Sequence, residues 1–177
     1  QALIPACSIT HTHPASHAAA LGLALMLNTL LETHDVDAAF AALDSAAQNM
    51  DAELFTRLQT AYRFEKSGMS VDEAAAVLGT SSSVYQTLPM AAFLCRRFYV
   101  PEELLAAAVT CGGNAGTITM ICGAFAGARF GLFRQNLFAV LSVPEFLTNL
   151  PQSSTRHPIH RKRNNCTKGG KCIRITP

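Results

Sequence analysis

The chain has 177 residues, of which 49% are apolar and 15% are charged. This length supports one domain with a sizeable core, and this composition excludes a disordered protein and a long solvated coiled coil. The net charge of +2 combines two unlike pieces: residues 156–177 carry seven Lys and Arg and no acid, a net of +7, whereas residues 1–155 carry a net of −5. Only the tail is basic enough to attract nucleic acid or an acidic membrane surface.

The start of the chain, Gln1–Pro5, has neither an initiator Met nor the basic stretch of a signal peptide. We therefore expect the chain to be the later part of a longer protein. The apolar run Ala18–Leu31 is interrupted by Asn28 and Thr29 and is shorter than the roughly 20 residues that a spanning helix needs, so we expect no transmembrane segment.

Cysteine usage indicates a reducing compartment. Four of the six Cys lie among apolar or small neighbours, without the density of a disulfide scaffold: Cys7, Cys95, Cys111 and Cys122. We expect free, buried thiols and a cytoplasmic location.

The first half of the chain predicts successive helices. Pro14 suits a first helical turn, and Ala15–Leu31 is rich in strong helix formers. Because its apolar residues lie nearly all round, we expect a buried central helix. Two further helices follow, over about Val36–Met50 with Asp35 as cap, and over about Ala52–Lys66 with Asp51 as cap and Gly68 as stop.

The next helix starts at a capping box, Ser70-Val-Asp-Glu73, and ends at Gly79 after Leu78. Helices are also expected over Val84–Phe98, Pro101–Thr110 and Thr117–Phe130. No period-2 run flanked by turn signals predicts a strand, so the class is all-α.

The last of these helices carries Gly123 and Gly127, and Gly131 follows at the same spacing of four. Glycine lowers helix propensity by roughly 1 kcal/mol relative to alanine. We expect the close approach of another helix to compensate for this loss.

Two segments are candidates for binding. The first, Ser8–His17, places His11, His13 and His17 just ahead of a helix. Three interpretations of this segment remain open. The histidines are simply exposed at a polar helix entry, they bind a metal, or His11 or His13 holds a phosphate at the helix start. The second, Thr110–Thr119, contains adjacent glycines that lead into a helix, an arrangement found both in anion sites and in ordinary helix–helix turns.

Three segments in order resemble the ADP-ribosylglycohydrolase family: Ile9–Ala19, Leu88–Phe93 and Ala108–Gly131. The first is most similar to the branch typified by dinitrogenase reductase-activating glycohydrolase. The resemblance covers about residues 7–132. It implies a compact, orthogonal all-α bundle over residues 1–150, incomplete at its N-terminus, followed by a basic tail over 151–177 that we expect to be disordered.

The resemblance implies hydrolysis of the bond between ADP-ribose and a protein side chain at a pair of Mg²⁺ or Mn²⁺ ions. The family's Thr-Asp-Asp motif has no match here. Its Gly-Gly-Asp-x-Asp-Thr motif falls on Gly112–Thr117, where Asn114 and Gly116 replace the two Asp and Thr117 alone remains as a metal ligand. Since hard divalent cations need several oxygen ligands, we expect an inactive or weakly active enzyme that binds no metal on its own.

Recognition of the ligand is the part of the function that these residues retain. The resemblance implies that His11 lies near a diphosphate and that the loop of Gly112, Gly113 and Asn114 approaches the ligand. Free ADP-ribose or an ADP-ribosylated protein is the expected partner, with nucleic acid only through the tail and no membrane. Two alternatives remain open. One is a non-catalytic nucleotide-binding module. The other is an interaction protein whose apolar face meets a partner chain, which supplies the missing N-terminal portion.

Overall fold

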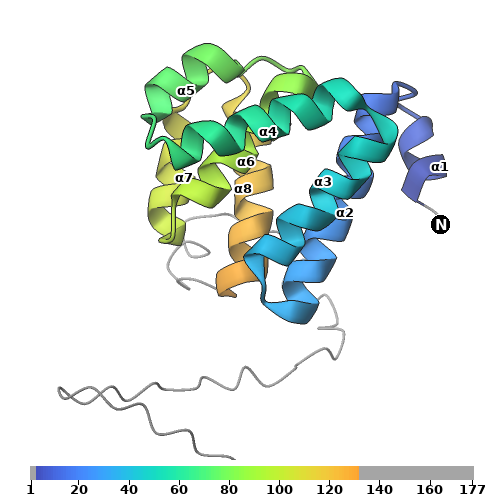
Figure 1. Ribbon diagram of the computed structural model, residues 1–177, viewed down its shortest axis with the longest axis horizontal. Helices are drawn as coiled ribbons and strands as arrows, with labels where there is room; N and C mark the ends of the chain where they lie inside the picture. The colour runs from blue at the N-terminus through green and yellow to red at the C-terminus, as the bar shows by residue number, and fades with distance from the viewer. Residues whose placement is uncertain (1–2, 132–177) are drawn as a thin grey trace, which may run out of the picture. The chain divides into compact units, whose positions relative to one another are not determined.

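A computed structural model describes residues 3–131, which belong to one compact unit, Gln1–Gln135. Within these residues the fold is all-α, as predicted, and contains no strand (Figure 1). The predicted tail and the expected boundary at residue 150 lie outside the described part of the chain. The helices are α1 (Leu3–Ser8), α2 (Pro14–Thr33), α3 (Val36–Met50), α4 (Ala52–Lys66), α5 (Val71–Leu78), α6 (Val84–Arg97), α7 (Pro101–Thr110) and α8 (Ala115–Phe130).

Side-chain caps set the helix starts that the sequence predicted. Asp35 accepts hydrogen bonds from two N–H groups at the start of α3, and Asp51 accepts one at the start of α4. At α5, Ser70 and Glu73 satisfy each other's backbone N–H groups, which completes the capping box. Each cap supplies an acceptor to a donor that the helix leaves unpaired, so these boundaries follow from local chemistry.

Helix α2 is not the buried centre of the fold, contrary to the prediction. It packs along α3 and buries one side, whereas Leu25 and Leu31 are exposed. At 20 residues it is longer than expected and apolar enough to span a membrane by length and composition, a test that core helices of soluble proteins and signal sequences also pass. One third of the residues in its most apolar window are buried inside the protein.

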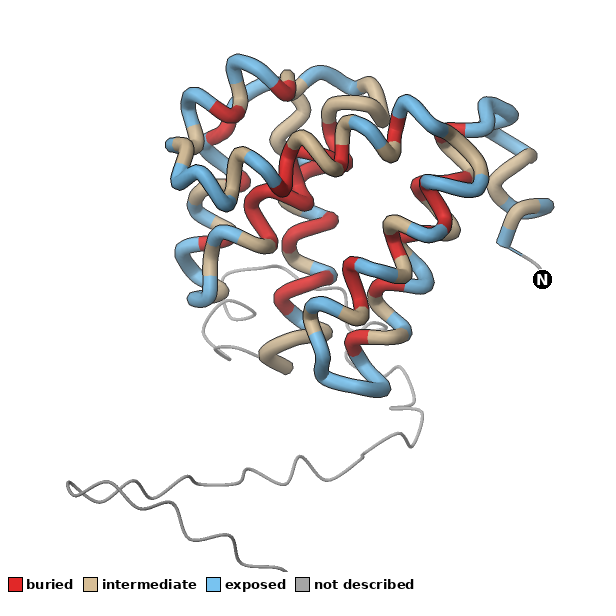
Figure 2. Tube along the Cα trace, viewed as in Figure 1, coloured by how far each residue is buried: buried red, intermediate tan, exposed pale blue. Residues whose placement is uncertain are grey.

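The central element is α6, in which every residue from Thr87 to Cys95 is buried (Figure 2). It lies against both α4 and α8, and its Phe93 and the Phe125 of α8 are among the largest fully buried side chains of the core.

Cys95, Cys111 and Cys122 are buried free thiols, as predicted. Cys7 is also a free thiol, but it is only partly buried, so the prediction of burial is wrong for this residue.

Close helix packing occurs at a glycine that the sequence did not single out. A Cβ added at Gly22 of α2 would lie 2.6 Å from Leu43 Cδ1 and 3.3 Å from the Leu43 carbonyl oxygen of α3. At Gly123 of α8 the same atom would lie 3.8 Å from Leu105 Cδ2, and at Gly127 it would meet nothing within 4 Å. We predicted that another helix packs closely against these glycines. Among the described residues, this prediction is wrong at Gly127, and at Gly123 the neighbouring helix α7 lies only at an ordinary contact distance.

Candidate functional site

The loop before α8 is fixed to the connection between α5 and α6. Gly112 and Gly113 have φ values of +81° and +58°, a region that favours glycine. A Cβ at Gly113 would collide with the carbonyl oxygen of Thr80, and the Asn114 N–H donates a hydrogen bond to that oxygen at 2.6 Å. A side chain at Gly113 would therefore push the loop away from its anchor.

The start of α8 keeps its backbone donors open. Helix α8 begins at Ala115, two residues earlier than predicted, and its N-cap Asn114 makes no side-chain cap. Instead, Thr117 Oγ1 donates to Asn114 Oδ1 at 3.1 Å. No hydrogen-bond acceptor within residues 3–131 pairs with the N–H groups of Ala115, Gly116 and Thr117. Three unpaired donors at the positive end of a helix dipole make this start suitable for an anion.

The start of α2 is different, because the chain uses its donors internally. His13 is the N-cap, and its Nδ1 accepts from the Ala15 N–H at 3.2 Å. The Ser16 and His17 N–H groups donate to the His13 carbonyl oxygen at 3.0 and 3.3 Å. The backbone N–H groups at this helix start are therefore engaged, so the predicted phosphate contact of His11 or His13 depends on the imidazole rings alone.

The other two histidines of the segment hold its turn or face solvent. His17 Nε2 donates to the His11 carbonyl oxygen at 2.7 Å and lies 3.2 Å from Ser8 Oγ. The His11 ring is exposed, with Nδ1 2.8 Å from Thr10 Oγ1. Its Nε2 atom makes no hydrogen bond to any residue that the structure describes. The exposed His13 ring also has an Nε2 atom with no hydrogen bond to the described residues, so these two ring atoms are available to a ligand.

The two predicted segments flank the start of α6 and do not touch. The starts of α2, α6 and α8 all lie on the upper side of the bundle in Figure 1. His13 packs edge-on against the ring of Tyr85 in the first turn of α6, with centroids 6.1 Å apart, and Thr80 just before α6 holds Asn114. Among residues 3–131, no hydrogen bond, ion pair or ring contact joins His11–His17 to Gly112–Thr117.

Tyr85 is a residue that the sequence did not single out, and it connects this region to α4. Its hydroxyl donates to Asp51 Oδ2 at 3.0 Å. Partial desolvation, with this hydrogen bond and the charge of Asp51, raises the pKa of the Tyr85 phenol above its ordinary value of 10.0.

The described residues do not fit a pair of Mg²⁺ or Mn²⁺ ions. Thr117 and Asn114 offer one hydroxyl and one amide oxygen, and these two atoms bond to each other. Gly116 has no side chain, and no three His, Cys, Asp or Glu residues in the described range are grouped to hold a metal. Hard cations require several oxygen ligands and neutralising carboxylates, which this loop lacks.

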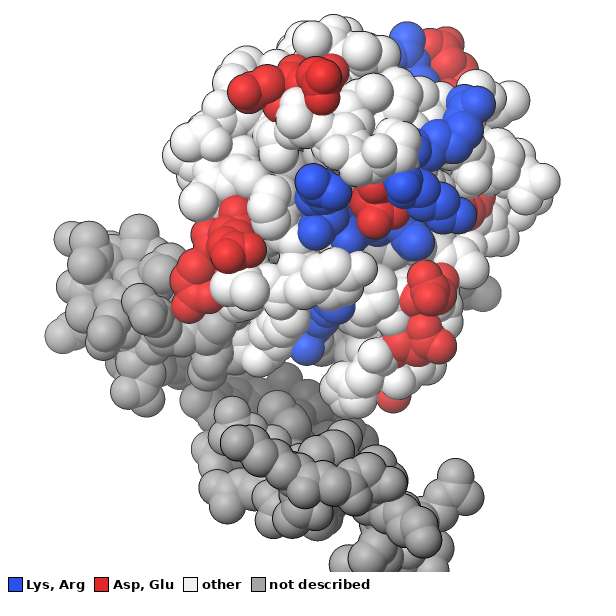
Figure 3. All heavy atoms as spheres, turned by 60° about the vertical axis from the view of Figure 1, so that its left-hand side comes forward, with Lys and Arg blue, Asp and Glu red and all other residues white. Residues whose placement is uncertain are grey.

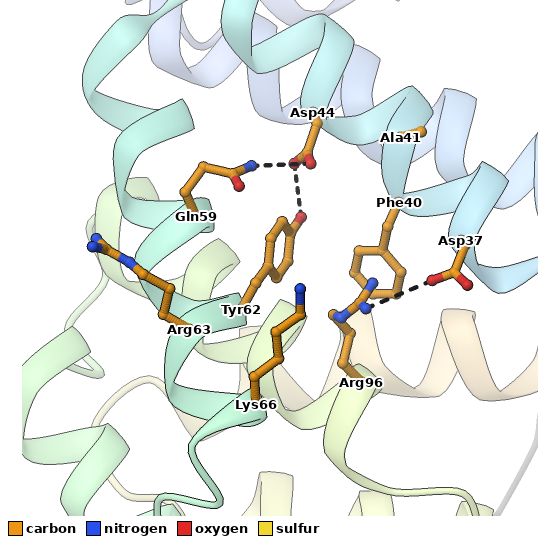
Figure 4. A pocket seen from close by; sticks show the side chains of 9 residues that line it. All are labelled: Asp37, Phe40, Ala41, Asp44, Gln59, Tyr62, Arg63, Lys66 and Arg96. Carbon is orange, nitrogen blue, oxygen red and sulfur yellow. Dashed lines mark hydrogen bonds and ion pairs between the residues drawn. The ribbon is translucent and has the colours of Figure 1, made fainter.

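A cavity of about 220 Å³ lies away from these segments, between α3, α4 and the end of α6 (Figure 4). None of the predicted site residues line it. Its side chains recur at spacings of three and four on α3 and on α4, a pattern that the sequence contains. That pattern does not show which two helix faces meet, so the cavity was not predicted.

Comparison with known proteins supports the resemblance. A model of the ADP-ribosylglycohydrolase family matches residues 1–148, which include His11–His17 and Gly112–Thr117. No curated protein and no solved structure matches the chain. Since the matched residues make up most of the sequence, the chain belongs to the ADP-ribosylglycohydrolase family.

Proposed function

We propose that this chain binds ADP-ribose at the start of α8 and is inactive or weakly active as a hydrolase. The observation that carries the proposal is the combination of unpaired N–H groups at Ala115–Thr117 with the absence of a carboxylate anywhere in Gly112–Thr117. Such a helix start suits the diphosphate of ADP-ribose. The same absence leaves the loop without the ligands that a divalent cation needs.

Each residue of the loop has a role in this proposal. Gly112 and Gly113 allow the backbone to turn and to come close to the ligand, and the N–H groups that follow donate to the phosphate oxygens. His11 Nε2 is proposed as a second polar contact to the ligand. Mg²⁺ or Mn²⁺, when bound, would supply an activated water for hydrolysis. This loop contains no carboxylate that could hold such an ion.

The proposed partner is ADP-ribose, free or attached to a protein, in the cytoplasm. A partner chain that supplies the family's Thr-Asp-Asp motif is a further proposal. We propose no nucleic-acid partner for residues 3–131, because the basic charge lies in the tail.

Calorimetric titration of the full chain with ADP-ribose tests the proposal through a matched pair of variants at Gly116. A Cβ at this position meets nothing within 4 Å, so both aspartate and asparagine fit. We expect Gly116→Asp to weaken binding at least tenfold in metal-free buffer, because its carboxylate repels the diphosphate, and Gly116→Asn to have a much smaller effect. Equal affinities for the two variants would contradict the proposal.

A His11→Ala variant tests the second polar contact. We expect its affinity for ADP-ribose to fall below that of the wild type. Unchanged affinity would remove His11 from the site and leave the α8 start as the binding element.

A further inference from the structure

The cavity between α3 and α4 is built around a paired carboxylate. Tyr62 of α4 donates its hydroxyl hydrogen to Asp44 Oδ1 of α3 at 2.8 Å, and Gln59 Nε2 donates to Asp44 Oδ2 at 3.0 Å. Both carboxylate oxygens are thus engaged at one end of the cavity (Figure 4). The other end is cationic.

Arg96, from the last turn of α6, forms much of that cationic end. Its guanidinium carbon lies 5.0 Å from the ring centroid of Phe40 and 5.1 Å from that of Tyr62, so the group lies beside the edge-to-face pair that these two rings form. The side chain is 21% exposed. Aromatic faces attract the cation but accept little from its N–H groups, which still require oxygen acceptors.

Those N–H groups are poorly satisfied within the described residues. Arg96 Nε is buried and makes no hydrogen bond. The nearest carboxylate oxygens are Asp37 Oδ1, 3.6 Å from Nη2, and Glu65 Oε2, 3.8 Å from Nε, and both distances exceed that of a hydrogen bond. A buried donor without an acceptor is unfavourable, and an oxyanion with two acceptor oxygens would relieve it.

One further cation, Lys66, lies beside Arg96. Figure 4 shows the Lys66 side chain directed into the cavity between Tyr62 and Arg96. Arg63 also lines the cavity, but its guanidinium points away from it and donates to Thr60 Oγ1 at 3.0 Å.

In Figure 3, basic side chains gather around acidic ones on one face of the described surface. Of the side chains that line the cavity, three are cationic and two are acidic, and the acid of Asp44 already has two hydrogen-bond donors. Glu65, which does not line the cavity, is a third acid and forms an ion pair with Arg96, so the cations and acids here are equal in number. What remains unmet is the buried Arg96 Nε–H, a donor without an acceptor.

We propose that this cavity binds a small molecule that bears an oxyanion, either a carboxylate or a phosphate, seated between Lys66 Nζ and the Arg96 guanidinium. The volume of about 220 Å³ accommodates several water-sized groups and therefore a phosphate or a small organic acid. No residue of the α8 start or of the histidine segment lines the cavity, so this site is separate from the proposed ADP-ribose site.

Nitrogen NMR of the full chain tests the proposal at the atom concerned. The Arg96 Nε–H signal is assigned by its loss in Arg96→Lys and is followed during titration with inorganic phosphate and, separately, with malonate, against sodium chloride at the same ionic strength. We expect one of the two anions to shift this signal saturably. The anion with the lower dissociation constant identifies the ligand as a phosphate or a carboxylate.

Two variants separate this site from general attraction of anions to a basic chain. Lys66→Gln should weaken the anion's affinity about tenfold, because a charge-assisted contact is lost. Arg97→Gln removes an exposed neighbour on the same helix that does not line the cavity, and should leave the affinity unchanged. A linear shift that chloride reproduces, or equal weakening by the two variants, would overturn the proposal.

Discussion

Replacing Gly22 with alanine should destabilise the pairing of α2 with α3, and the size of the effect follows from the packing. The new Cβ would lie 2.6 Å from Leu43 Cδ1, 3.3 Å from the Leu43 carbonyl oxygen and 3.5 Å from Ala46 Cβ. Carbon atoms in contact prefer about 3.5–4.0 Å. Leu43 is only 1% exposed, so it has little room to move, and such overpacking costs about 1–3 kcal/mol.

Gly123→Ala is the matched control, because it gains the same helix propensity of about 1 kcal/mol without a clash. Its Cβ meets only Leu105 Cδ2, at an ordinary contact distance of 3.8 Å. We therefore expect Gly123→Ala to be more stable than the wild type, and Gly22→Ala to be less stable than Gly123→Ala by about 1–3 kcal/mol.

Urea denaturation followed by circular dichroism measures both variants, with equal m-values as the condition for comparison. Equal stability of the two variants would refute the packing at Gly22. A destabilised Gly123→Ala would show that α7 approaches α8 more closely at this position than the structure places it.

Three further predictions concern hydrogen bonds, pH and thiols. Asp51→Ala should lower the free energy of unfolding by about 1–2 kcal/mol, because it removes the cap of α4 and the acceptor of Tyr85; urea denaturation that matches the wild type would contradict this. Burial raises the pKa of the Asp44 carboxyl above its ordinary value of 3.8. A raised folded-state pKa means that this group's contribution is full at low pH and is lost as pH rises through that pKa, so Asp44→Asn should gain stability relative to the wild type as pH rises from the carboxyl's ordinary pKa of 3.8 through its raised value. A stability difference that does not change with pH would be inconsistent with this assignment. The Sγ atoms of Cys95 and Cys122 lie 3.8 Å apart in the core, and burial raises the pKa of Cys95. Both thiols should resist a disulfide reagent in the folded protein, as mapped by mass spectrometry, and labelling as fast as in urea would disprove their burial.

The sequence predicted those parts of the fold that depend on neighbouring residues. Asp35, Asp51 and the pair Ser70 and Glu73 each supply an acceptor within three residues of the donor that needs it, so helix starts could be placed without the tertiary structure. The short helix α1 was not predicted, because no residue in it provides a comparable signal.

Features that depend on which helices meet could not be predicted. The apolar residues of α2 suggested a central helix, whereas α6 fills that position despite Pro89 in its interior. Glycine spacing indicated close packing at Gly123 and Gly127, but the close contact occurs at Gly22. In each case the sequence shows that a residue is small or apolar and does not show what lies opposite.

The candidate site was predicted only in part. The Gly112–Thr117 motif identified the α8 start, since adjacent glycines before a helix are a local signal. The contact of Gly113 and Asn114 with Thr80 involves residues more than 30 positions apart, and no pattern in the sequence relates them. The engagement of His13 and His17 in the turn before α2 likewise depends on the folded backbone.

The most direct test of the central claim is calorimetric titration of the full chain with ADP-ribose, once in EDTA and once in Mg²⁺. If the start of α8 binds the ligand through backbone donors and the loop holds no metal, saturable binding should be present in EDTA, and Mg²⁺ should leave the dissociation constant unchanged. Binding that appears only in Mg²⁺ would contradict the account.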